Sequence, residues 1–416
     1  MGFNTIKEKK AESAKFMTQE ITNIIKTFGK RAPGSEGEKK ACYYMAEQLK
    51  EFGCDDVKVE PFTLHPKSFY GWIYISVTLL LAAFGLYFLG AYLDHAIWAK
   101  AVALGFIVLA MALMVGQFIM YRQVVDKLFP KETSYNVTAI KKPTGEIKRR
   151  IFFNGHPDAA SEWTFNYLFG GVGFAIHFLT SMVGMGYLIA VLIAAFFPAV
   201  QQAQGINLPL ITELGLGSLF FLPFWLGLFI LWNEKKVVDG ANDNLSGCYM
   251  GIAVMKALKD NNVELENTEV GVILSGSEEA GLRGAKAWCK AHADEYKDVE
   301  TLIYAFDTIR ESKFLSVNVK DLNSSVKADP HACELFKNAA DKLGITCSLG
   351  TVPLGSTDAA AFVQGGLKSV GITAMDHNLK DYYHTRRDSF DNMDEECLAD
   401  CFAVTVQTLE DFDKGL

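Results

Sequence analysis

Four long apolar stretches constrain the fold of this chain more than any other feature. Residues 69–93 and 101–121 contain no charged side chain, and residues 163–212 contain no Asp, Glu, Lys or Arg. A helix of about 20 apolar residues can cross the ~30 Å hydrocarbon core of a bilayer. We therefore predict transmembrane helices at 69–93, 101–121, about 173–197 and about 214–232, arranged as two hairpins. For the first pair, the alternative is two buried helices of a large soluble core.

The remainder of the 416-residue chain has a different composition. Hydrophobic residues make up 50% of the whole and charged residues 21%, which is too apolar for an ordinary soluble enzyme and too polar for a pure membrane bundle. The net charge of -8, without a concentrated basic face, argues against nucleic acid as a partner. We therefore expect an enzyme domain into which membrane hairpins are inserted.

Outside the apolar stretches, strand and helix patterns alternate. Strands are expected at 56–64, 269–275, 301–306, 314–319 and 369–374, and helical patterns stand between the later ones. This order predicts an α/β fold with a mostly parallel mixed sheet covered by helices on both faces. A P-T-G-E turn separates the expected strands 135–140 and 150–154, which predicts a β-hairpin.

Acidic and histidine residues stand near the ends of the expected strands. The stretch V-V-D-G-A-N-D-N-L-S-G places one carboxylate in a tight turn directly before a helix, where its two oxygens can bind two cations. The motifs N-G-H-P-D and S-G-S-E-E-A-G follow two strands, and a further Asp and His come later. Imidazole and carboxylate ligands suit two zinc-like cations. The residues concerned are His156, Asp158, Asp243, Glu278, Glu279, Asp307 and His384.

Five motifs in order, H-x-D, D-G-A-x-D-N-x-S-G, S-E-E-x-G-x-x-G, a strand ending in F-D, and Y-H-T-x-x-D, resemble those of the M28 family of dinuclear zinc peptidases. Members of that family are mostly aminopeptidases. The resemblance implies a zinc aminopeptidase-like fold and two Zn²⁺ or similar divalent cations. One would be held by His156, Asp307 and Asp243, and the other by Glu279, His384 and the same Asp243.

The resemblance also implies roles for three further residues. Glu278 would be the general base for a water molecule shared by the two cations. Asp158 would hold the His156 ring through its second nitrogen. Asp358, in G-S-T-D, matches a family motif near the substrate pocket and is a candidate substrate-binding residue.

Several assignments have alternatives at this stage. Glu278 and Glu279 could exchange roles, and His377 is a second candidate for the last histidine ligand. Asp239 is expected to support the turn rather than bind metal. His177 lies in an apolar span, where it bonds a neighbouring helix or marks an ion path.

The expected function is that of a membrane-anchored dinuclear zinc exopeptidase that removes N-terminal residues from peptides. The alternatives are a carboxypeptidase- or amidase-type enzyme, a glutaminyl-cyclase-like enzyme, and a catalytically silent membrane receptor. The peptidase domain would comprise residues 1–68, 122–166 and 233–416, with hairpins at 69–121 and 167–232. The expected partners are a peptide substrate and the lipid bilayer, and the sequence does not specify an oligomeric state.

Charge and cysteine patterns bear on location. Lys and Arg are concentrated on the side of the spans that carries the polar segments, and the positive-inside rule makes that side cytoplasmic. The eight cysteines form no C-x-x-C pair, which favours reduced thiols. The first residues lack the apolar core of a signal peptide. We therefore predict a multi-pass membrane protein whose catalytic domain lies in the cytoplasm.

Overall fold

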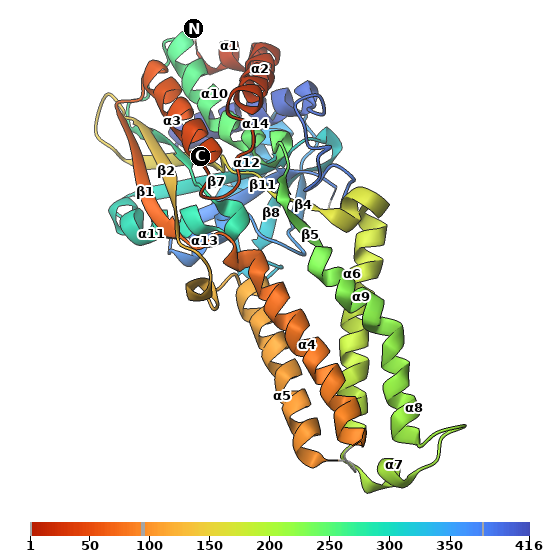
Figure 1. Cartoon of the computed structure of the whole chain (residues 1–416). Helices are drawn as coiled ribbons and strands as arrows, with labels where there is room; N and C mark the ends of the chain where they lie inside the picture. The colour runs from red at the N-terminus through yellow and green to blue at the C-terminus, as the bar shows by residue number, and fades with distance from the viewer. Residues whose placement is uncertain (1, 93–95, 377) are drawn as a thin grey trace. The chain divides into compact units, whose positions relative to one another are not determined.

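A nine-stranded mixed sheet, in the order β1-β2-β6-β3-β7-β11-β8-β10 with β9 paired to β8, forms the centre of the larger of two units in the computed structural model (Figure 1). The structure describes residues 2–92, 96–376 and 378–416. The larger unit comprises Met1–Pro66, Pro130–Glu162 and Glu234–Leu416, and the smaller comprises Lys67–Phe129 and Trp163–Asn233.

The strands of the sheet are β1 (Asp56–Leu64), β2 (Glu132–Lys141), β3 (Arg149–Gly155), β6 (Thr268–Leu274), β7 (Glu300–Ile309), β8 (Leu315–Asp321), β9 (Val326–Lys327), β10 (Ser348–Thr351) and β11 (Lys368–Ala374). The helices of this unit are α1 (Phe3–Glu8), α2 (Lys10–Phe28), α3 (Glu36–Glu51), α10 (Ser246–Asp260), α11 (Arg283–His292), α12 (Pro330–Lys342), α13 (Asp358–Gln364) and α14 (Glu395–Asp413).

The four central strands, β6, β3, β7 and β11, are parallel to one another. Antiparallel pairs flank them, with β1 on β2, β2 on β6 and β8 on β11. The α/β fold class expected from the sequence is therefore confirmed. Because parallel strands end at the same edge of a sheet, the residues that follow β3, β6 and β7 gather there.

Helices cover both faces of the sheet, as two adjacent residues of β3 show. The ring of Phe152 meets Trp288 of α11 at a centroid distance of 6.4 Å, whereas the Cβ of Phe153 packs against Gly251 of α10. Consecutive strand residues point to opposite faces. It follows that α10 and α11 cover opposite faces, and both phenylalanines are buried between layers.

The expected β-hairpin of 135–140 with 150–154 is wrong, because β6 lies between β2 and β3. β6 pairs antiparallel with β2 and parallel with β3. The turn after β2 is instead bonded to the segment that leads into β6, through Thr144 N to Leu265 O at 2.9 Å and Gly145 N to Glu266 O at 2.9 Å. Because the turn is bonded to the segment before β6, β6 can lie between β2 and β3.

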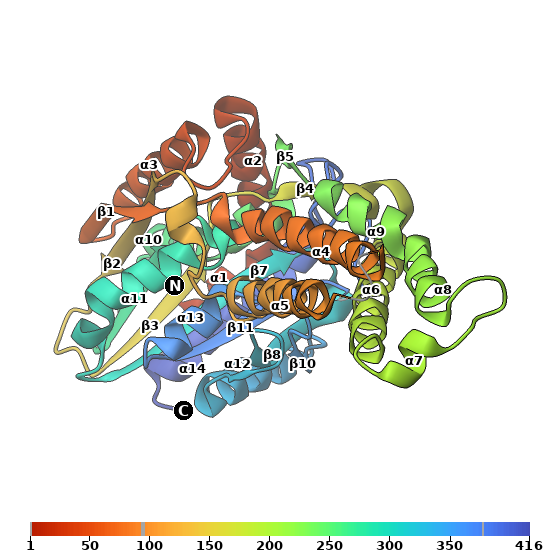
Figure 2. The same ribbon diagram turned by 60° about the horizontal axis from the view of Figure 1, so that its bottom comes forward.

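Among its described residues, the smaller unit contains four helical segments that are long and apolar enough to cross a membrane: Ser68–Gly90, Ile97–Ile119, Thr164–Ala194 and Leu210–Ile230. Its helices are α4 (Ser68–Tyr92), α5 (Ile97–Leu113), α6 (Thr164–Ala194), α7 (Pro198–Gln202), α8 (Leu210–Gly217) and α9 (Leu222–Gly227). The third segment begins nine residues before the expected 173, and Gly170, with φ +68°, interrupts it. α4 and α5 lie side by side in both views (Figures 1 and 2).

One face of α6 carries exposed apolar side chains at helical spacing. Val172, Ile176, Leu179 and Val183 are 73%, 58%, 61% and 62% exposed. A stripe of this kind costs free energy in water and none in hydrocarbon. The exposure pattern therefore fits a helix that faces lipid.

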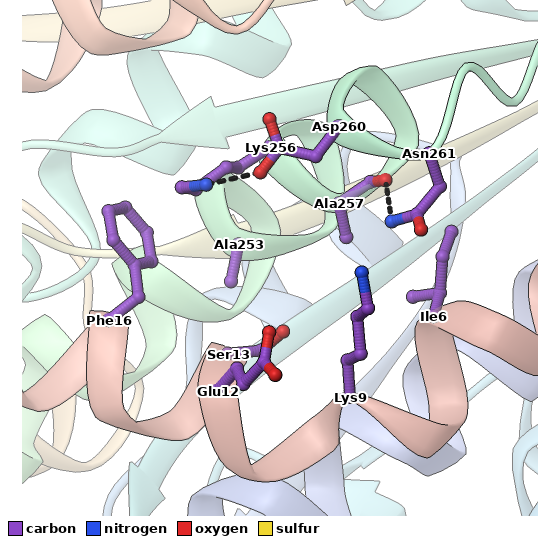
Figure 3. Close-up of a pocket in the computed structure, with 10 residues that line it drawn as sticks. All are labelled: Ile6, Lys9, Glu12, Ser13, Phe16, Ala253, Lys256, Ala257, Asp260 and Asn261. Carbon is purple, nitrogen blue, oxygen red and sulfur yellow. Dashed lines mark hydrogen bonds and ion pairs between the residues drawn. The ribbon is translucent and has the colours of Figure 1, made fainter.

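Short paired strands, β4 (Ser161–Trp163) and β5 (Trp232–Val237), contain the points where the chain leaves the larger unit for the second time and returns to it. Elsewhere in that unit, a surface pocket lies where α1 and α2 pack against the second half of α10 (Figure 3). Within it, Lys256 pairs with Asp260 and its ammonium lies 5.4 Å from the Phe16 ring centroid. The pocket lining is Ile6, Lys9, Glu12, Ser13, Phe16, Ala253, Lys256, Ala257, Asp260 and Asn261.

Candidate metal centre

Asp243 lies in a short helical turn, η5 (Ala241–Leu245), between β5 and α10. The carboxylate of Asp388 accepts hydrogen bonds from the backbone N–H groups of Asn242 at 2.9 Å and Asp243 at 3.1 Å. Asn244 donates its side-chain amide to Phe306 O at 2.7 Å, which ties the turn to β7. Asp243 is 3% exposed, so its carboxylate is held in a fixed and buried position.

His156 and Asp158 follow the end of β3. The Nε2 atom of His156 lies 3.3 Å from Asp243 Oδ1, and its Nδ1 atom lies 3.3 Å from Asp158 Oδ1. Asp158 also accepts hydrogen bonds from the backbone N–H groups of Glu278 and Glu279, both at 3.0 Å. Asp158 therefore joins the His156 ring to the turn that carries the two glutamates.

Glu278 and Glu279 form a tight turn after β6, preceded by Ser277 at φ 57° and followed by Gly281 at φ 97°. The Oε1 atom of Glu279 lies 3.3 Å from His384 Nε2, whereas the Oε2 atom of Glu278 lies 3.7 Å from His156 Nε2. The two neighbouring carboxylates thus point to different histidines.

The last two residues complete the cluster from other elements. Asp307 lies near the end of β7, where its Oδ1 accepts a hydrogen bond from Thr308 Oγ1 at 2.8 Å. His384 lies between β11 and α14, with Nε2 2.9 Å from Asp243 Oδ2 and its ring stacked on Tyr383 at 4.1 Å. Both Oδ atoms of Asp243 thus contact an imidazole, one from each side.

The side chains that the sequence singled out fall into overlapping sets whose candidate ligand atoms lie within 4.8 Å of one another. One set is His156, Asp243 and Asp307, and another is Asp243, Glu279 and His384. Asp243 belongs to both. A further set joins His156 with Glu278 and Glu279, so the geometry also brings Glu278 within reach of the cluster.

The charges of this cluster fit divalent cations. Burial, with nearby carboxylates, raises the pKa of Glu278 and Glu279 well above the usual range and that of Asp307 to about 7. Burial also acts on Asp243, but hydrogen bonds from His156 and His384 outweigh it and lower its pKa. Four buried carboxylates and two imidazoles leave an excess of negative charge that has no counterpart among these side chains. Two cations with oxygen and nitrogen ligands would balance it.

Four further candidates were named from the sequence, and the three of them that the structure describes lie outside these sets. Asp358 begins α13, is 2% exposed, and accepts a hydrogen bond from Ser275 Oγ, while burial raises its pKa to about 6. Asp239 forms an ion pair with Lys30. His177 stacks on Phe165 at 4.0 Å within α6, and His377 lies outside the described residues.

Sequence reasoning gave no role to several buried residues that hold the ligand loops. Asp388 closes the Y-H-T-x-x-D motif, so its position was visible although its contacts with the Asp243 turn were not. Glu38 accepts hydrogen bonds from Ser277 N at 2.6 Å and Gly34 N at 2.7 Å, which fixes the start of the glutamate turn. Arg31 is buried beside two of the loops. Only the tertiary structure reveals that these charged residues are buried.

Comparison with known proteins agrees with this arrangement. Residues 231–409 match the model of peptidase family M28, which supports a peptidase-type hydrolase. None of the curated proteins matches the chain. The match includes Asp243, Glu278, Glu279, Asp307 and His384 but begins after His156.

Solved structures show the same fold at low sequence identity. The zinc aminopeptidase BSAP from Bacillus subtilis is 16% identical, with a TM-score of 0.55 over 96% of this chain and 95% of that chain. A Zn-dependent exopeptidase from Parabacteroides distasonis is 14% identical, with a TM-score of 0.53 over 95% and 96%. Glutaminyl cyclase from Porphyromonas gingivalis is 13% identical, with a TM-score of 0.54 over 97% and 98%. At these identities the likeness establishes the fold, and function has to be argued from the site.

Proposed function

We propose that this chain is a membrane-anchored exopeptidase that removes N-terminal residues from peptides with the help of two zinc-like cations. The observation that carries the proposal is the shared position of Asp243, whose two carboxylate oxygens each lie within 3.3 Å of a different histidine. A carboxylate placed in this way can bridge two cations.

The ligand assignment follows the two sets around Asp243. His156 and Asp307 would complete one cation site, and Glu279 and His384 the other. When bound, the cations would polarise the scissile carbonyl and favour ionisation of a water molecule. Asp158 orients His156, because its carboxylate faces the Nδ1 atom while the Nε2 atom faces Asp243.

Glu278 is the proposed general base. Burial and neighbouring carboxylates raise its pKa, which suits a group that must both accept and release a proton. It takes a proton from the attacking water and transfers it to the nitrogen of the shortened peptide, which leaves as a free amine when its bond to the carbonyl carbon breaks. Its backbone N–H is bonded to Asp158, so the turn that carries it is held in place.

Tyr383 is the proposed hydrogen-bond donor to the carbonyl oxygen during attack by water. Burial and the surrounding carboxylates raise its pKa well above the usual range, so the phenol stays protonated at neutral pH. A protonated hydroxyl can donate a hydrogen bond to the carbonyl oxygen as that oxygen gains negative charge. The stacking of its ring on His384 keeps it beside the ligands.

The four apolar segments provide the membrane anchor in this proposal. They belong to chain segments inserted at two points of the enzyme sequence, so the peptidase domain is discontinuous. The Lys and Arg residues beside the spans favour a cytoplasmic location for this domain.

A glutaminyl-cyclase-like or carboxypeptidase-type activity is the alternative, because glutaminyl cyclases share the fold to the same degree as aminopeptidases. A catalytically silent receptor is disfavoured, because such a protein would need neither two sets of metal ligands nor a buried general base.

The test is metal content and peptide cleavage by the detergent-purified protein. We expect two zinc-like ions per chain and cleavage of peptides with a free N-terminus, but not of the same peptides after N-acetylation. Cleavage of the acetylated peptides would favour a carboxypeptidase or amidase. Cyclisation of N-terminal glutamine would favour the cyclase, and absence of bound metal would contradict the proposal.

A further inference from the structure

Arg31 lies in the segment between α2 and α3 and is 0% exposed. Its Nε atom donates a hydrogen bond to Pro157 O at 2.7 Å. Its Nη2 atom donates to Asp239 O at 2.7 Å and Gly240 O at 3.1 Å. The backbone carbonyl of Arg31 accepts a further hydrogen bond from Ala159 N at 2.9 Å. One side chain therefore joins two loops that are more than 80 positions apart in the sequence.

These two loops carry ligands of the same candidate cation site. Pro157 follows His156 directly, and Gly240 is followed three positions later by Asp243. The side chains of His156 and Asp243 meet at 3.3 Å. Because ligand positions must be held within a fraction of an ångström, a shift of either loop changes this site first.

The guanidinium is bonded to backbone carbonyl oxygens rather than to a carboxylate. Burying a charge in this way is costly, and burial lowers the pKa of Arg31. The planar fork of an arginine can bond two separate carbonyl groups at fixed angles, which the single ammonium of a lysine cannot do. The bonding geometry of the guanidinium therefore explains an arginine at this position better than a gain in folding stability does.

Gly240 allows the close approach of Arg31 because it has no side chain. It has φ +60°, and a Cβ there would lie 3.0 Å from Arg31 Nη2 and 2.6 Å from Asp243 O. The absence of a side chain lets the guanidinium approach the backbone of the Asp243 turn. Lys30 supports the loop from outside through its ion pair with Asp239.

We propose that Arg31 is a positioning residue that fixes the distance between the His156 and Asp243 loops, and so sets the affinity of the cation site formed by His156, Asp243 and Asp307. This inference rests on the proposed function for the identity of the ligands. Arg31 itself touches neither cation nor substrate. The other site, with Glu279 and His384, depends on it only through the shared Asp243.

The experiment compares Arg31→Ala with Arg150→Ala in the full-length, detergent-purified protein. Arg150 is also buried, but it bonds Glu269 at 2.8 Å and is the second residue of β3, ~20 Å from His156 along an extended strand. Zn²⁺ affinity at each site is measured by competition with a chromophoric chelator, which requires no peptide cleavage.

We expect Arg31→Ala to weaken one of two Zn²⁺ sites by about 10- to 100-fold, the range found when residues that orient metal ligands are removed. Millimolar guanidinium should restore that site, because it can occupy the cavity left by the side chain. Arg150→Ala should keep both affinities and show no response to guanidinium. Arg31→Lys, which keeps the charge without the fork, should also weaken one site.

Unchanged Zn²⁺ affinity in both Arg31 variants would overturn the inference. Equal loss of both sites without rescue by guanidinium would also overturn it, since that result indicates a general structural defect. If Arg31→Ala does not fold, Arg31→Lys decides with the same measurement. Wild-type protein that binds two Zn²⁺ but cleaves no peptide would contradict the proposed function and leave this inference standing, whereas wild-type protein that binds no Zn²⁺ would overturn both.

Discussion

Glu278 and Glu279 are adjacent in the sequence, yet their carboxylates have different neighbours. Glu279 lies 3.3 Å from His384, in a ligand set with Asp243, whereas Glu278 approaches His156 at 3.7 Å. The tight turn between Ser277 and Gly281, both at positive φ, produces this divergence. A peptide with ordinary strand geometry would send neighbouring side chains to opposite faces, away from a common site.

We predict that Glu278→Gln retains two metal ions and loses about 100- to 10,000-fold in kcat, the range for removal of a general base. The amide keeps the size of the side chain but cannot take up the proton. Metal content by elemental analysis and kcat on a free-amine peptide are the measurements. Loss of one metal with this substitution would exchange the roles of Glu278 and Glu279.

The substitution Tyr383→Phe tests the proposed hydrogen bond to the carbonyl oxygen independently. Removal of its hydroxyl should lower kcat by about 100-fold, with little change in KM or metal content, because the hydrogen bond forms only as the carbonyl oxygen gains charge. Tyr382→Phe is the matched control, since that ring lies beside Arg310, at 5.9 Å, rather than on a ligand. Equal effects of the two substitutions would argue against this role for Tyr383.

At the scale of elements, local patterns predicted the strands that carry the site. The expected strand 269–275 corresponds to Thr268–Leu274, and 56–64 is β1 as predicted. Strand neighbours could not be derived in the same way, because β6 pairs with β2 and β3 across long connections. The anchoring roles of Asp388, Glu38 and Arg31 were also missed, since nothing in a sequence marks which charged residues become buried.

The turn before α10 is an element whose backbone can be tested directly. Gly240→Ala should destabilise the protein by ~1–2 kcal/mol for the left-handed conformation. We expect about 1 kcal/mol or more beyond this, because the new Cβ would lie 2.6 Å from Asp243 O. Gly344→Ala is the control, with φ +66° and no atom within 4 Å of its Cβ.

Thermal unfolding and metal content measure this difference. Gly344→Ala should show only the smaller loss of stability and keep both metals, whereas Gly240→Ala should also lose metal affinity. Equal stability and equal metal content in the two variants would show that the approach of Arg31 and Asp243 to Gly240 has no energetic weight.

At the scale of the whole chain, two units alternate along the sequence. The larger is built from three chain segments and the smaller from two, so every crossing between them falls at the base of an apolar hairpin. A hairpin returns the chain to the side from which it left. If both hairpins cross a membrane, as proposed above, they would keep all three segments of the larger unit on one side of it, as assembly of a single metal centre requires.

The side of the membrane on which the larger unit lies can be tested by cysteine labelling. Ile206, 92% exposed between α7 and α8, belongs to the short loop opposite the basic flanks, and Glu36, with a side chain 74% exposed, belongs to the larger unit. A membrane-impermeant maleimide added to intact cells should label Ile206→Cys at once, and Glu36→Cys only after permeabilisation, because the positive-inside rule would place the Lys- and Arg-rich larger unit in the cytoplasm. The native thiols that are only half-buried, Cys54 and Cys289, belong to the larger unit and should behave like Glu36→Cys. Labelling of Glu36→Cys in intact cells would reverse the orientation and place the peptidase domain outside.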